Sequence, residues 1–325
     1  MQYYQMMKAL RMLKKPKPGC LGIEIQSVPI PQPKNGELLV KIEAAAINPS
    51  DLMNATGGFP YTVYPRIVGR DYAGTVISGA SHLVGTRVFG TSGSELSFTK
   101  DGTHAEYCII PEKAAVRMPS NLSFTEAASV GVPFTTAYLA LSRGETKGSD
   151  IVLVVGALGA VGSAVCQIAE DWGCKVITVS RSGSTDINTV VDPELKRVHE
   201  LVEKVDVVID TVGDPLLMKS ALNQLGIGGR LSYISAPKQG SIEFSYDMKQ
   251  IYRKNLKIIG CNSLLLSLVE SNSLLKNMVA KFEAGKYKVL NKKIAETSLT
   301  DECINSYRKL MNECSTKFVI TMSTN

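Results

Sequence analysis

Three glycines at every third position form the sharpest chemical signal in the chain. Gly156, Gly159 and Gly162 directly follow the apolar run 151–155 and directly precede a segment of helical periodicity. A residue without Cβ permits a tight turn, lets the backbone approach a pyrophosphate, and lets the next helix sit close to a sheet. The helix N-terminus presents free N–H groups and a positive dipole end to phosphate. This context favours a dinucleotide-binding site; the alternative is a tight turn without a ligand.

The residues after the second expected strand indicate which dinucleotide would bind. An NAD-binding protein usually has Asp or Glu there, for the hydroxyls of the adenosine ribose. Here the strand 175–179 is followed by Ser180, Arg181 and Ser182, and the first acidic residue is Asp186. A guanidinium flanked by hydroxyls suits a phosphate group. The pattern predicts NADPH as the cofactor; the alternative is a solvated loop arginine.

Metal-ligating residue types show no recognised spacing. The chain has 3 histidines and 7 cysteines, without a His-Glu-x-x-His or a Cys-x-x-Cys pattern. We therefore expect no metal site. An odd number of unpaired cysteines is typical of reduced, mostly buried thiols in a cytosolic enzyme.

Composition indicates a globular protein of about two domains. The 325 residues are 44% hydrophobic and 20% charged, and 36 Lys+Arg against 30 Asp+Glu give a net charge of +6. So mild a charge does not indicate a nucleic-acid partner, and no apolar run approaches the roughly 18–20 residues of a membrane span. We expect neither nucleic acid nor membrane as a partner.

We expect a cytoplasmic location, with a mitochondrial one as the alternative because the first 17 residues are basic.

Two kinds of pattern organise the chain. Up to about residue 120, short apolar runs are broken by Gly, Pro and Asn, which predicts β-strands, the first near 7–13, and a flexible loop over 91–102. From Ser123, which with Glu126 resembles a capping box, strands and helices alternate, which predicts a parallel sheet with helices on both faces. The expected strands are 151–155, 175–179, 205–210, 230–234 and 256–260, and the expected helices are 161–172, 194–204, 215–225 and 264–285. A strand near 288–294, a helix over 300–314 and a strand over 317–321 are expected to follow.

Several short motifs are spread over nearly the whole chain. They are Ala46-Ile47-Asn48-Pro49-Ser50-Asp51, Val68-Gly69-Arg70-Asp71-Tyr72-Ala73-Gly74, Ala105-Glu106-Tyr107, Glu126-Ala127-Ala128, Thr136-Ala137-Tyr138, the glycine loop, Asp210-Thr211-Val212-Gly213 and Gly228-Gly229-Arg230. Together they resemble the zinc-independent medium-chain dehydrogenase/reductase superfamily, in its quinone oxidoreductase and enoyl reductase branch. Zinc-bearing relatives have Gly-His-Glu where this chain has Gly69-Arg70-Asp71, and the four closely spaced cysteines of those relatives are missing from the region 91–108.

The resemblance implies an α/β fold in which a Rossmann doubly wound parallel sheet is inserted into a GroES-like β-rich lobe. The implied domains are a catalytic lobe over 1–122, an NADPH-binding domain over 123–285 and a return to the lobe over 286–325. A homodimer through the Rossmann domain is also implied, with 256–260 and 263–269 at the contact. Because the segment 180–189 is shorter than in relatives, we expect a helix to be missing there.

The resemblance also implies a set of cofactor contacts. The residues implied to bind the pyrophosphate are Gly156, Leu158, Gly159, Ala160 and Val161. The residues implied to bind the adenosine phosphate are Ser180, Arg181 and Ser182. Around the nicotinamide, the implied residues are Thr136, Cys261, Asn262 and Ser263. The other implied cofactor contacts are Gly213, Ile234, Ser235 and Lys317.

Without a metal, hydride transfer suits an acceptor that is already electron-poor, and it needs a donor for the oxygen that gains charge. We assign that role to Tyr61 or to the Asn48 amide. The alternatives are a packing aromatic for Tyr61 and a turn residue ahead of Pro49 for Asn48. The family's tyrosine aligns with Phe59, which has no proton to give, and a second family aromatic falls on Met53. The residues Asp51, Asp71 and His104 are expected to be structural.

The implied function is an NADPH-dependent, metal-independent reductase that transfers hydride to a small electrophilic acceptor, a quinone or an activated α,β-unsaturated carbonyl. A trans-2-enoyl thioester reductase is the alternative within this class. Phe59 motivates a second alternative, a non-catalytic NADPH-binding protein that has lost its proton donor.

Overall fold

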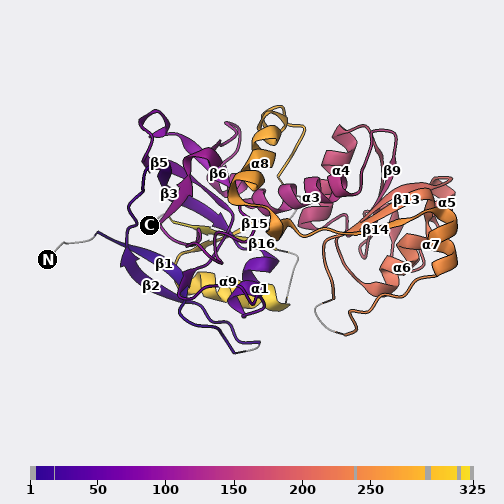
Figure 1. Ribbon diagram of the computed structural model, residues 1–325, viewed down its shortest axis with the longest axis horizontal. Helices are drawn as coiled ribbons and strands as arrows, with labels where there is room; N and C mark the ends of the chain where they lie inside the picture. The colour runs from indigo at the N-terminus through magenta and orange to yellow at the C-terminus, as the bar shows by residue number, and fades with distance from the viewer. Residues whose placement is uncertain (1–4, 18, 238–239, 290–293, 313–315, 323–325) are drawn as a thin grey trace. The chain divides into compact units, whose positions relative to one another are not determined.

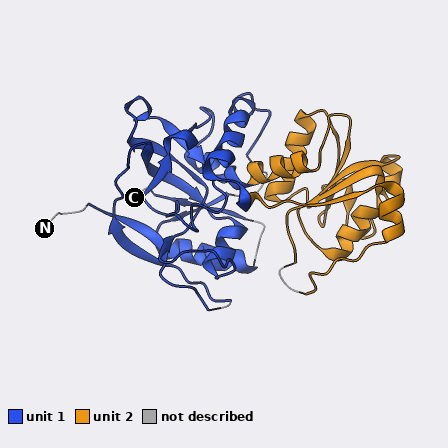
Figure 2. Cartoon of the chain, in the orientation of Figure 1, with its two compact units in different colours: residues 1–132, 264–325 blue, residues 133–263 orange. Residues whose placement is uncertain are grey.

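The computed structural model describes residues 5–17, 19–237, 240–289, 294–312 and 316–322 (Figure 1). They form two compact units, residues 1–132 with 264–325 (unit 1) and residues 133–263 (unit 2) (Figure 2). The chain thus leaves unit 1, builds unit 2 and returns, as expected for an inserted domain. Unit 2 begins later and ends earlier than the expected 123–285.

Unit 1 contains two sheets. The first is antiparallel, with strand order β2 (Glu24–Pro29), β1 (Met6–Met12) and β4 (Arg66–Ile67). The second has the order β15 (Ile294–Ser298), β16 (Lys317–Thr321), β3 (Glu37–Ala46), β5 (Tyr72–Ser78), β6 (Arg87–Gly90) and β8 (Val116–Arg117), and β7 (Tyr107–Pro111) also pairs with β3. Only β15 and β16 pair in parallel among these strands. This confirms the β-rich lobe and the strand expected near 7–13.

Four α-helices belong to the described parts of unit 1: α1 (Pro49–Ala55), α2 (Phe124–Ser129), α8 (Leu268–Glu283) and α9 (Asp301–Asn312). Helix α2 begins with the expected capping box, since the Ser123 N–H donates to Glu126 Oε2 at 2.8 Å and the Glu126 N–H to Ser123 Oγ at 3.2 Å. Helix α2 packs on β3 and β5, and α8 packs on β8. These contacts with lobe strands explain why both helices fall in unit 1 rather than in the Rossmann unit. Parts of the segments expected at 288–294 and 300–314 lie outside the described residues.

The segment 91–102 is not the flexible loop that its polarity suggests. Leu96, Ser97 and Phe98 are fully buried. The Leu96 N–H donates to Ser92 Oγ at 3.1 Å, and the Phe98 N–H donates to Glu95 O at 3.2 Å. Local hydrogen bonds and burial therefore hold this segment in the interior of unit 1.

Unit 2 is built on a six-stranded parallel sheet. Its order is β11 (Ile187–Asn188), β10 (Lys175–Ser180), β9 (Ile151–Val155), β12 (Val205–Asp210), β13 (Leu225–Tyr233) and β14 (Lys257–Gly260). The chain moves outward from β9 in one direction and then from β12 in the other, which is the doubly wound topology and places a switch point between these two strands. The accompanying helices are α3 (Gly131–Arg143), α4 (Ala160–Asp171), α5 (Val198–Leu201), α6 (Pro215–Asn223) and α7 (Met248–Lys254).

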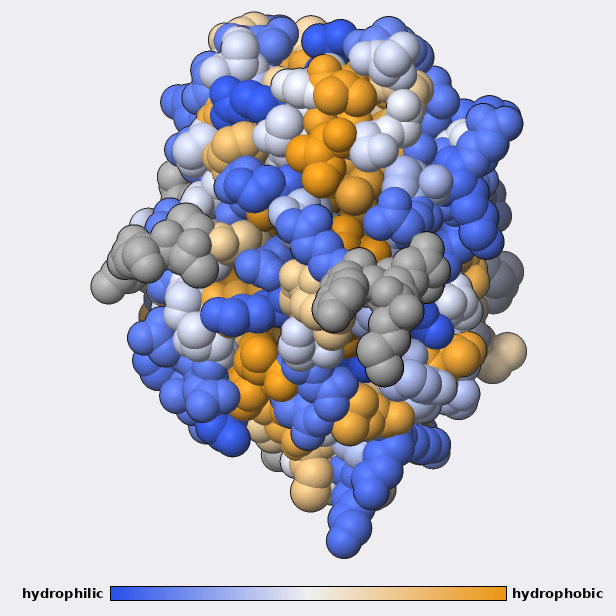
Figure 3. Space-filling model, turned by 90° about the vertical axis from the view of Figure 1, so that its left-hand side faces the viewer, coloured by the Kyte–Doolittle hydropathy of each residue, from blue (hydrophilic) through white to orange (hydrophobic). Residues whose placement is uncertain are grey.

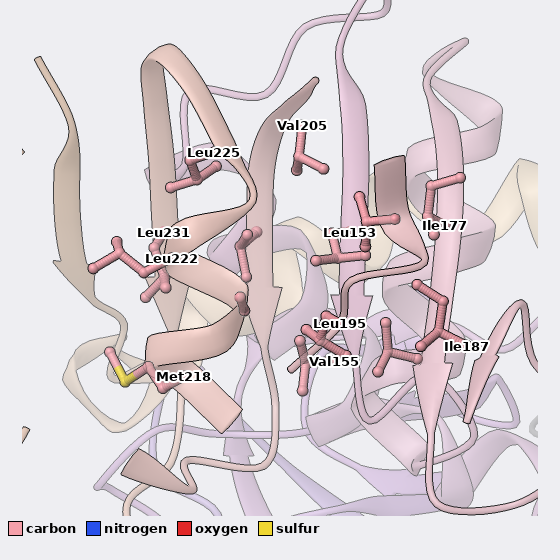
Figure 4. Close-up of a cluster of buried hydrophobic side chains, with 14 of the residues drawn as sticks. Leu153, Val155, Ile177, Ile187, Leu195, Val205, Met218, Leu222, Leu225 and Leu231 are labelled. Carbon is pink, nitrogen blue, oxygen red and sulfur yellow. The ribbon is translucent and has the colours of Figure 1, made fainter. Parts of the chain in front are cut away.

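The sheet of unit 2 packs against α5, α6 and α7 through an apolar cluster (Figure 4). Its labelled members include Leu153, Val155, Ile177, Ile187, Leu195, Val205, Met218, Leu222, Leu225 and Leu231, all buried. The solid apolar run Ile151–Val155 forms the central strand, as expected for a strand covered on both faces.

Local backbone chemistry explains where unit 2 departs from expectation. The helix expected over 194–204 shrinks to α5, because Leu195 adopts φ +57° and the Asp192 carboxylate binds the N–H groups of Lys196 and Arg197. Helix α7 was not expected, although Asp247 caps its start. Residues 181–186 form bends between β10 and β11 and contain no helix, as the shortness of this segment predicted.

Candidate functional site

The glycine loop turns sharply out of the central strand of unit 2. Gly156, directly after β9, adopts φ +83°, a conformation that side chains disfavour. Gly159 is the N-cap of α4, and its N–H donates to Gly156 O at 2.9 Å. A Cβ on Gly162 would overlap the Gly156 carbonyl. The loop is therefore closed against the first turn of α4, whose N–H groups are available to an anion.

The other predicted contacts of unit 2 follow the carboxyl ends of neighbouring strands. The loops after β9, β12, β13 and β14 carry the glycine loop, Gly213, residues 234–235 and residues 261–263, and these strands are adjacent in the sheet. Gly213 lies against the Ser235 backbone, where a Cβ would overlap it. In an open parallel sheet, this edge at the switch point is where ligands bind.

Asp210 organises one of these loops, a role that sequence reasoning missed. Its Oδ1 accepts hydrogen bonds from the N–H groups of Val212 at 2.8 Å and Gly213 at 3.0 Å. The side chain is fully buried, and burial raises the pKa of Asp210. The signal available in the sequence was an acid at the end of a buried strand, followed by glycine at the third position.

Thr136 and Ser263, both predicted beside the nicotinamide, are brought together. Thr136 Oγ1 on α3 donates to Ser263 Oγ at 2.9 Å. Nearby in sequence, the Cys261 N–H donates to Tyr233 O at 2.9 Å, and burial raises the pKa of the Cys261 thiol to about 11. Cys261 therefore stays a neutral thiol, and its backbone continues the path of β14.

The loop after β10 is shaped by its hydroxyl groups. Ser180 Oγ accepts from the Ser182 N–H at 3.1 Å. The first acid, Asp186, accepts from the Thr178 N–H at 2.8 Å and from the Thr178 hydroxyl at 2.6 Å. Arg181 is exposed, and it forms no ion pair with any described residue. The acid is thus held by its own strand, while the guanidinium extends into solvent.

Unit 1 contains a buried polar chain of Lys317, Asn48 and Asp71. Lys317 Nζ donates to Asn48 Oδ1 at 2.6 Å, and Asn48 Nδ2 donates to Asp71 Oδ2 at 2.9 Å. The Asp71 carboxylate also accepts from the Val132 N–H at 3.0 Å. Burial raises the pKa of Asp71, and the charge of Lys317 opposes this shift. Asn48 is also the N-cap of α1, where Asp51 Oδ2 accepts from the Asn48 N–H at 2.8 Å. The backbone of Asn48 thus lies at the turn ahead of Pro49, and its amide donates to Asp71.

Arg70 is the largest fully buried side chain of unit 1. Its Nη1 donates to Ser92 O at 3.1 Å, its Nη2 to Ser50 Oγ, and its Nε lies 3.5 Å from Asp51 Oδ1. Asp51 therefore has the structural role that we expected.

His104 is fully buried, between the Ala46 carbonyl at 3.2 Å from Nε2 and the Tyr307 hydroxyl at 3.0 Å from Nδ1. Burial lowers the pKa of His104, so the ring is neutral. This geometry matches the expected structural role.

Tyr61 lies in an aromatic cluster rather than in the buried polar chain. Its ring centroid is 5.6 Å from that of Phe59 and 5.5 Å from that of Phe98, and its side chain is 42% exposed. Partial burial raises the pKa of Tyr61, while the charge of Arg70 lowers it. The phenol therefore keeps its proton at neutral pH. Met53 is exposed and does not replace the missing aromatic.

Two further observations concern metals and membranes. Within the described ranges, no three His, Cys, Asp or Glu side chains gather as a metal site requires. No helix in the same ranges has the length and apolarity needed to span a bilayer.

The fold and the glycine-lined edge define a two-unit protein of the dehydrogenase type. Residues 34–120 match the family described as "Alcohol dehydrogenase GroES-like domain", and residues 160–279 match "Zinc-binding dehydrogenase". A "Quinone oxidoreductase" of Sus scrofa is 30% identical over 262 residues, which cover 74% of this chain and 76% of the relative. An "Acryloyl-coenzyme A reductase" of Sulfurisphaera tokodaii is 30% identical over 277 residues, covering 74% and 80%. The crystal structure of an alcohol dehydrogenase superfamily protein from Novosphingobium aromaticivorans superposes with a TM-score of 0.83 at 25% identity, covering 98% of this chain and 100% of that one.

The chain belongs to the medium-chain dehydrogenase/reductase superfamily, in its quinone oxidoreductase branch. Membership indicates a dinucleotide cofactor of the NAD(P) type. It also explains the insertion of a Rossmann unit into a GroES-like lobe.

Proposed function

We propose that this protein is an NADPH-dependent, metal-independent reductase that transfers hydride to a quinone or to an activated α,β-unsaturated carbonyl. The observation that carries the proposal is the edge of the unit 2 sheet, where the glycine loop meets a neighbouring loop that offers an unpaired arginine. The names of the relatives support the class of acceptor, since one is a quinone oxidoreductase and one reduces an acryloyl thioester.

NADPH is preferred to NADH on the chemistry of the loop after β10. A bound 2′-phosphate needs a cation and short donors, which Arg181 and the hydroxyls of Ser180 and Ser182 can supply. An NADH site needs a carboxylate for the ribose hydroxyls. Two hydrogen bonds from Thr178 to Oδ2 of Asp186 hold this carboxylate against β10.

The residues of unit 2 fit the rest of a dinucleotide. Because Gly162 has no Cβ, the first turn of α4 lies close to the Gly156 carbonyl, and the amides of residues 158, 160 and 161 would hold the pyrophosphate. Thr136, together with residues 213, 234–235 and 261–263, would hold the nicotinamide end. When bound, the reduced nicotinamide supplies the hydride.

The oxygen of the acceptor gains negative charge as hydride arrives at carbon, and a hydrogen-bond donor would stabilise it. Tyr61 can donate because its phenol is protonated at neutral pH. The Asn48 amide has one hydrogen bonded to Asp71 and a second that can face an acceptor. Lys317, bonded to the Asn48 carbonyl oxygen, fixes which way this amide points.

Arg70 supports metal independence. Zinc-bearing relatives have histidine at this position, whereas here a permanent cation is buried among Ser50, Asp51 and Ser92. A guanidinium donates hydrogen bonds and cannot ligate a metal, and its charge repels a divalent ion nearby. Elemental analysis of the purified protein should therefore show no stoichiometric zinc.

The test is an absorbance assay of NADPH oxidation with a naphthoquinone, a medium-chain enone and a crotonyl thioester. We expect turnover of at least one acceptor, and the preferred one separates a quinone reductase from a trans-2-enoyl thioester reductase. If NADPH binds and no acceptor is reduced, the non-catalytic alternative that Phe59 motivates replaces the enzyme.

The cofactor is tested with Arg181→Ala. Removing the cation should weaken NADPH at least tenfold and leave NADH nearly unchanged. The matched control is Arg197→Ala, because Arg197 is an exposed arginine of the same unit whose partner, Glu200, is also exposed. Equal losses for both nucleotides in Arg181→Ala would contradict the assignment.

We also propose a homodimer through unit 2. Strand β14 is the last strand of its sheet, so its free edge can pair with a second copy. Sedimentation velocity should show a dimer, and Ile258→Pro, which removes an edge N–H, should give a monomer.

A further inference from the structure

A cavity of about 590 Å³ opens in unit 1, and none of its walls belongs to the proposed cofactor or acceptor site. Its walls come from β1, β2, residues 31–37, β4, residues 100–102 and β7. The apolar lining includes Met7, Val28, Ile67 and Ile109. The polar and charged lining includes Arg11, Lys34, Lys100, Glu37, Asp101 and Tyr107. A volume of this size is typical of pockets that hold small organic molecules.

One side of the cavity is apolar. Met7 and Ile67 are buried in a small hydrophobic cluster, and Val28 and Ile109 are partly buried against it. Figure 3 shows the side of the molecule that carries unit 1, where hydrophobic residues lie among hydrophilic ones. An apolar wall open to solvent gains free energy when a ligand's hydrocarbon covers it, roughly fourfold in affinity for each buried methylene.

The charges on the other side are unbalanced. Asp101 Oδ1 accepts hydrogen bonds from Arg66 Nη1 at 3.0 Å and from the Ile67 N–H at 3.1 Å. Glu37 Oε2 accepts a hydrogen bond from the backbone N–H of Lys34 at 2.9 Å.

Three cations face these two acids. Lys100 is paired with Glu95, which does not line the cavity. Arg11 donates only to the neutral amide oxygen of Gln26, at 2.9 Å, and neither Arg11 nor Lys34 forms an ion pair with a described residue. Arg11 and Lys34, against the carboxylate of Glu37, thus leave a net charge of +1 beside the apolar residues, once Lys100 and Asp101 are counted with their partners Glu95 and Arg66.

We propose that this cavity is a second ligand site, which binds a medium-chain carboxylate. The carboxylate is held by Arg11 and Lys34, and the alkyl chain covers Met7, Val28 and Ile109. The guanidinium and the ammonium can donate to the two oxygens of a carboxylate, and their charge less that of Glu37 is +1, which balances the ligand's single negative charge. The site is independent of the proposed reductase activity, because it uses none of its residues.

The test is calorimetric titration of the full chain with decanoate and with decanol, an uncharged ligand of the same chain length. We expect saturable binding of decanoate, at least tenfold weaker binding of decanol, and the same decanoate affinity with saturating NADPH present. Arg11→Gln and Lys34→Gln should each weaken decanoate roughly three- to tenfold and leave decanol unchanged.

The matched control is Lys8→Gln. Lys8 lies on β1 beside Met7 but is exposed, while Met7 and Ala9 are buried, so its side chain points to the opposite face. It removes the same charge, and it should leave both affinities unchanged. Val28→Trp, which fills the cavity, should abolish binding of both ligands, with thermal denaturation confirming that the variant is folded.

Three results would overturn the proposal: no saturable binding of decanoate, equal losses in Lys8→Gln and in the two pocket variants, or displacement of decanoate by NADPH. The last result would place decanoate at the cofactor edge and would leave the proposed reductase intact.

Discussion

Replacing Lys317 with methionine tests whether the buried polar chain of unit 1 acts as one unit. The ammonium is buried, and its 2.6 Å bond to Asn48 Oδ1 is charge-assisted. Methionine keeps the apolar stem and removes the donor. The substitution leaves the Asn48 oxygen without its donor and removes a cation near the buried Asp71 carboxylate. We therefore expect the free energy of unfolding to fall by about 2–4 kcal/mol.

The pH dependence of this loss has a definite sign. Burial raises the pKa of Asp71, so between its ordinary pKa, about 3.9, and the raised value the native state binds more protons than the unfolded state. Stability from this group is therefore lost as the pH rises through that window. Without Lys317 the pKa of Asp71 rises further, because the lysine charge lowers it. The loss caused by Lys317→Met should be larger at pH 8 than at pH 5.

The assay is urea denaturation followed by circular dichroism at both pH values, combined with a double-mutant cycle. Asp71→Asn removes the charge that Lys317 compensates, so Lys317→Met should cost about 1–3 kcal/mol less in that background. Lys309→Met, an exposed lysine on α9, is the control and should change stability by at most about 0.5 kcal/mol. Additive losses that are also independent of pH would refute the coupling.

Four further predictions concern other parts of the molecule. Gly162→Ala places a Cβ against the Gly156 carbonyl, so calorimetry should show at least tenfold weaker NADPH binding; unchanged affinity would mean that the loop does not hold the pyrophosphate. Tyr61→Phe should lower kcat with little change in KM, and an unchanged kcat would leave Asn48 as the donor. Tyr307→Phe should cost about 1 kcal/mol by removing the hydroxyl at 3.0 Å from His104 Nδ1. Because the pKa of His104 is lowered in the native state, the stability of the unaltered protein should fall as the pH drops below about 6.5, and His104→Gln should flatten that fall.

Strong local patterns predicted unit 2 well. The strands Ile151–Val155 and Val205–Asp210 have the expected bounds, because a buried parallel strand is read from a mostly apolar run, unbroken in the first and interrupted only by Asp206 before its end in the second. The prediction of a helix over 194–204 was wrong in its bounds, because the Asp192 carboxylate and the left-handed backbone of Leu195 compete with helical hydrogen bonding. Helix α7 was missed although Met248, Ile251 and Tyr252 recur at helical spacing, because seven residues are shorter than the window over which a helical period is read.

The segment 91–102 shows what local sequence cannot reveal. Its serines, threonines and glycines are typical of an exposed loop, yet Ser97 is fully buried. Its hydroxyl lies 3.1 Å from Asn54 Nδ2 and accepts from the Gly69 N–H at 3.2 Å. These partners are distant in the chain, so only the fold shows that a polar segment satisfies buried groups of other elements.

The same long-range hydrogen bonding separates the two proposed donors. Turning the Asn48 amide toward an acceptor would break its bonds to Lys317 at 2.6 Å and Asp71 at 2.9 Å, so Asn48 can act only in the orientation it already has. Tyr61 is bound by ring packing on Phe59 and Phe98, which permits rotation of its hydroxyl without the loss of a buried hydrogen bond. Asn48 can therefore donate only to an acceptor whose oxygen lies in one fixed direction, whereas Tyr61 can donate to acceptors of varied shape. A reductase that uses Tyr61 should lose activity toward the whole acceptor panel in Tyr61→Phe, whereas one that uses Asn48 should lose it in Asn48→Leu.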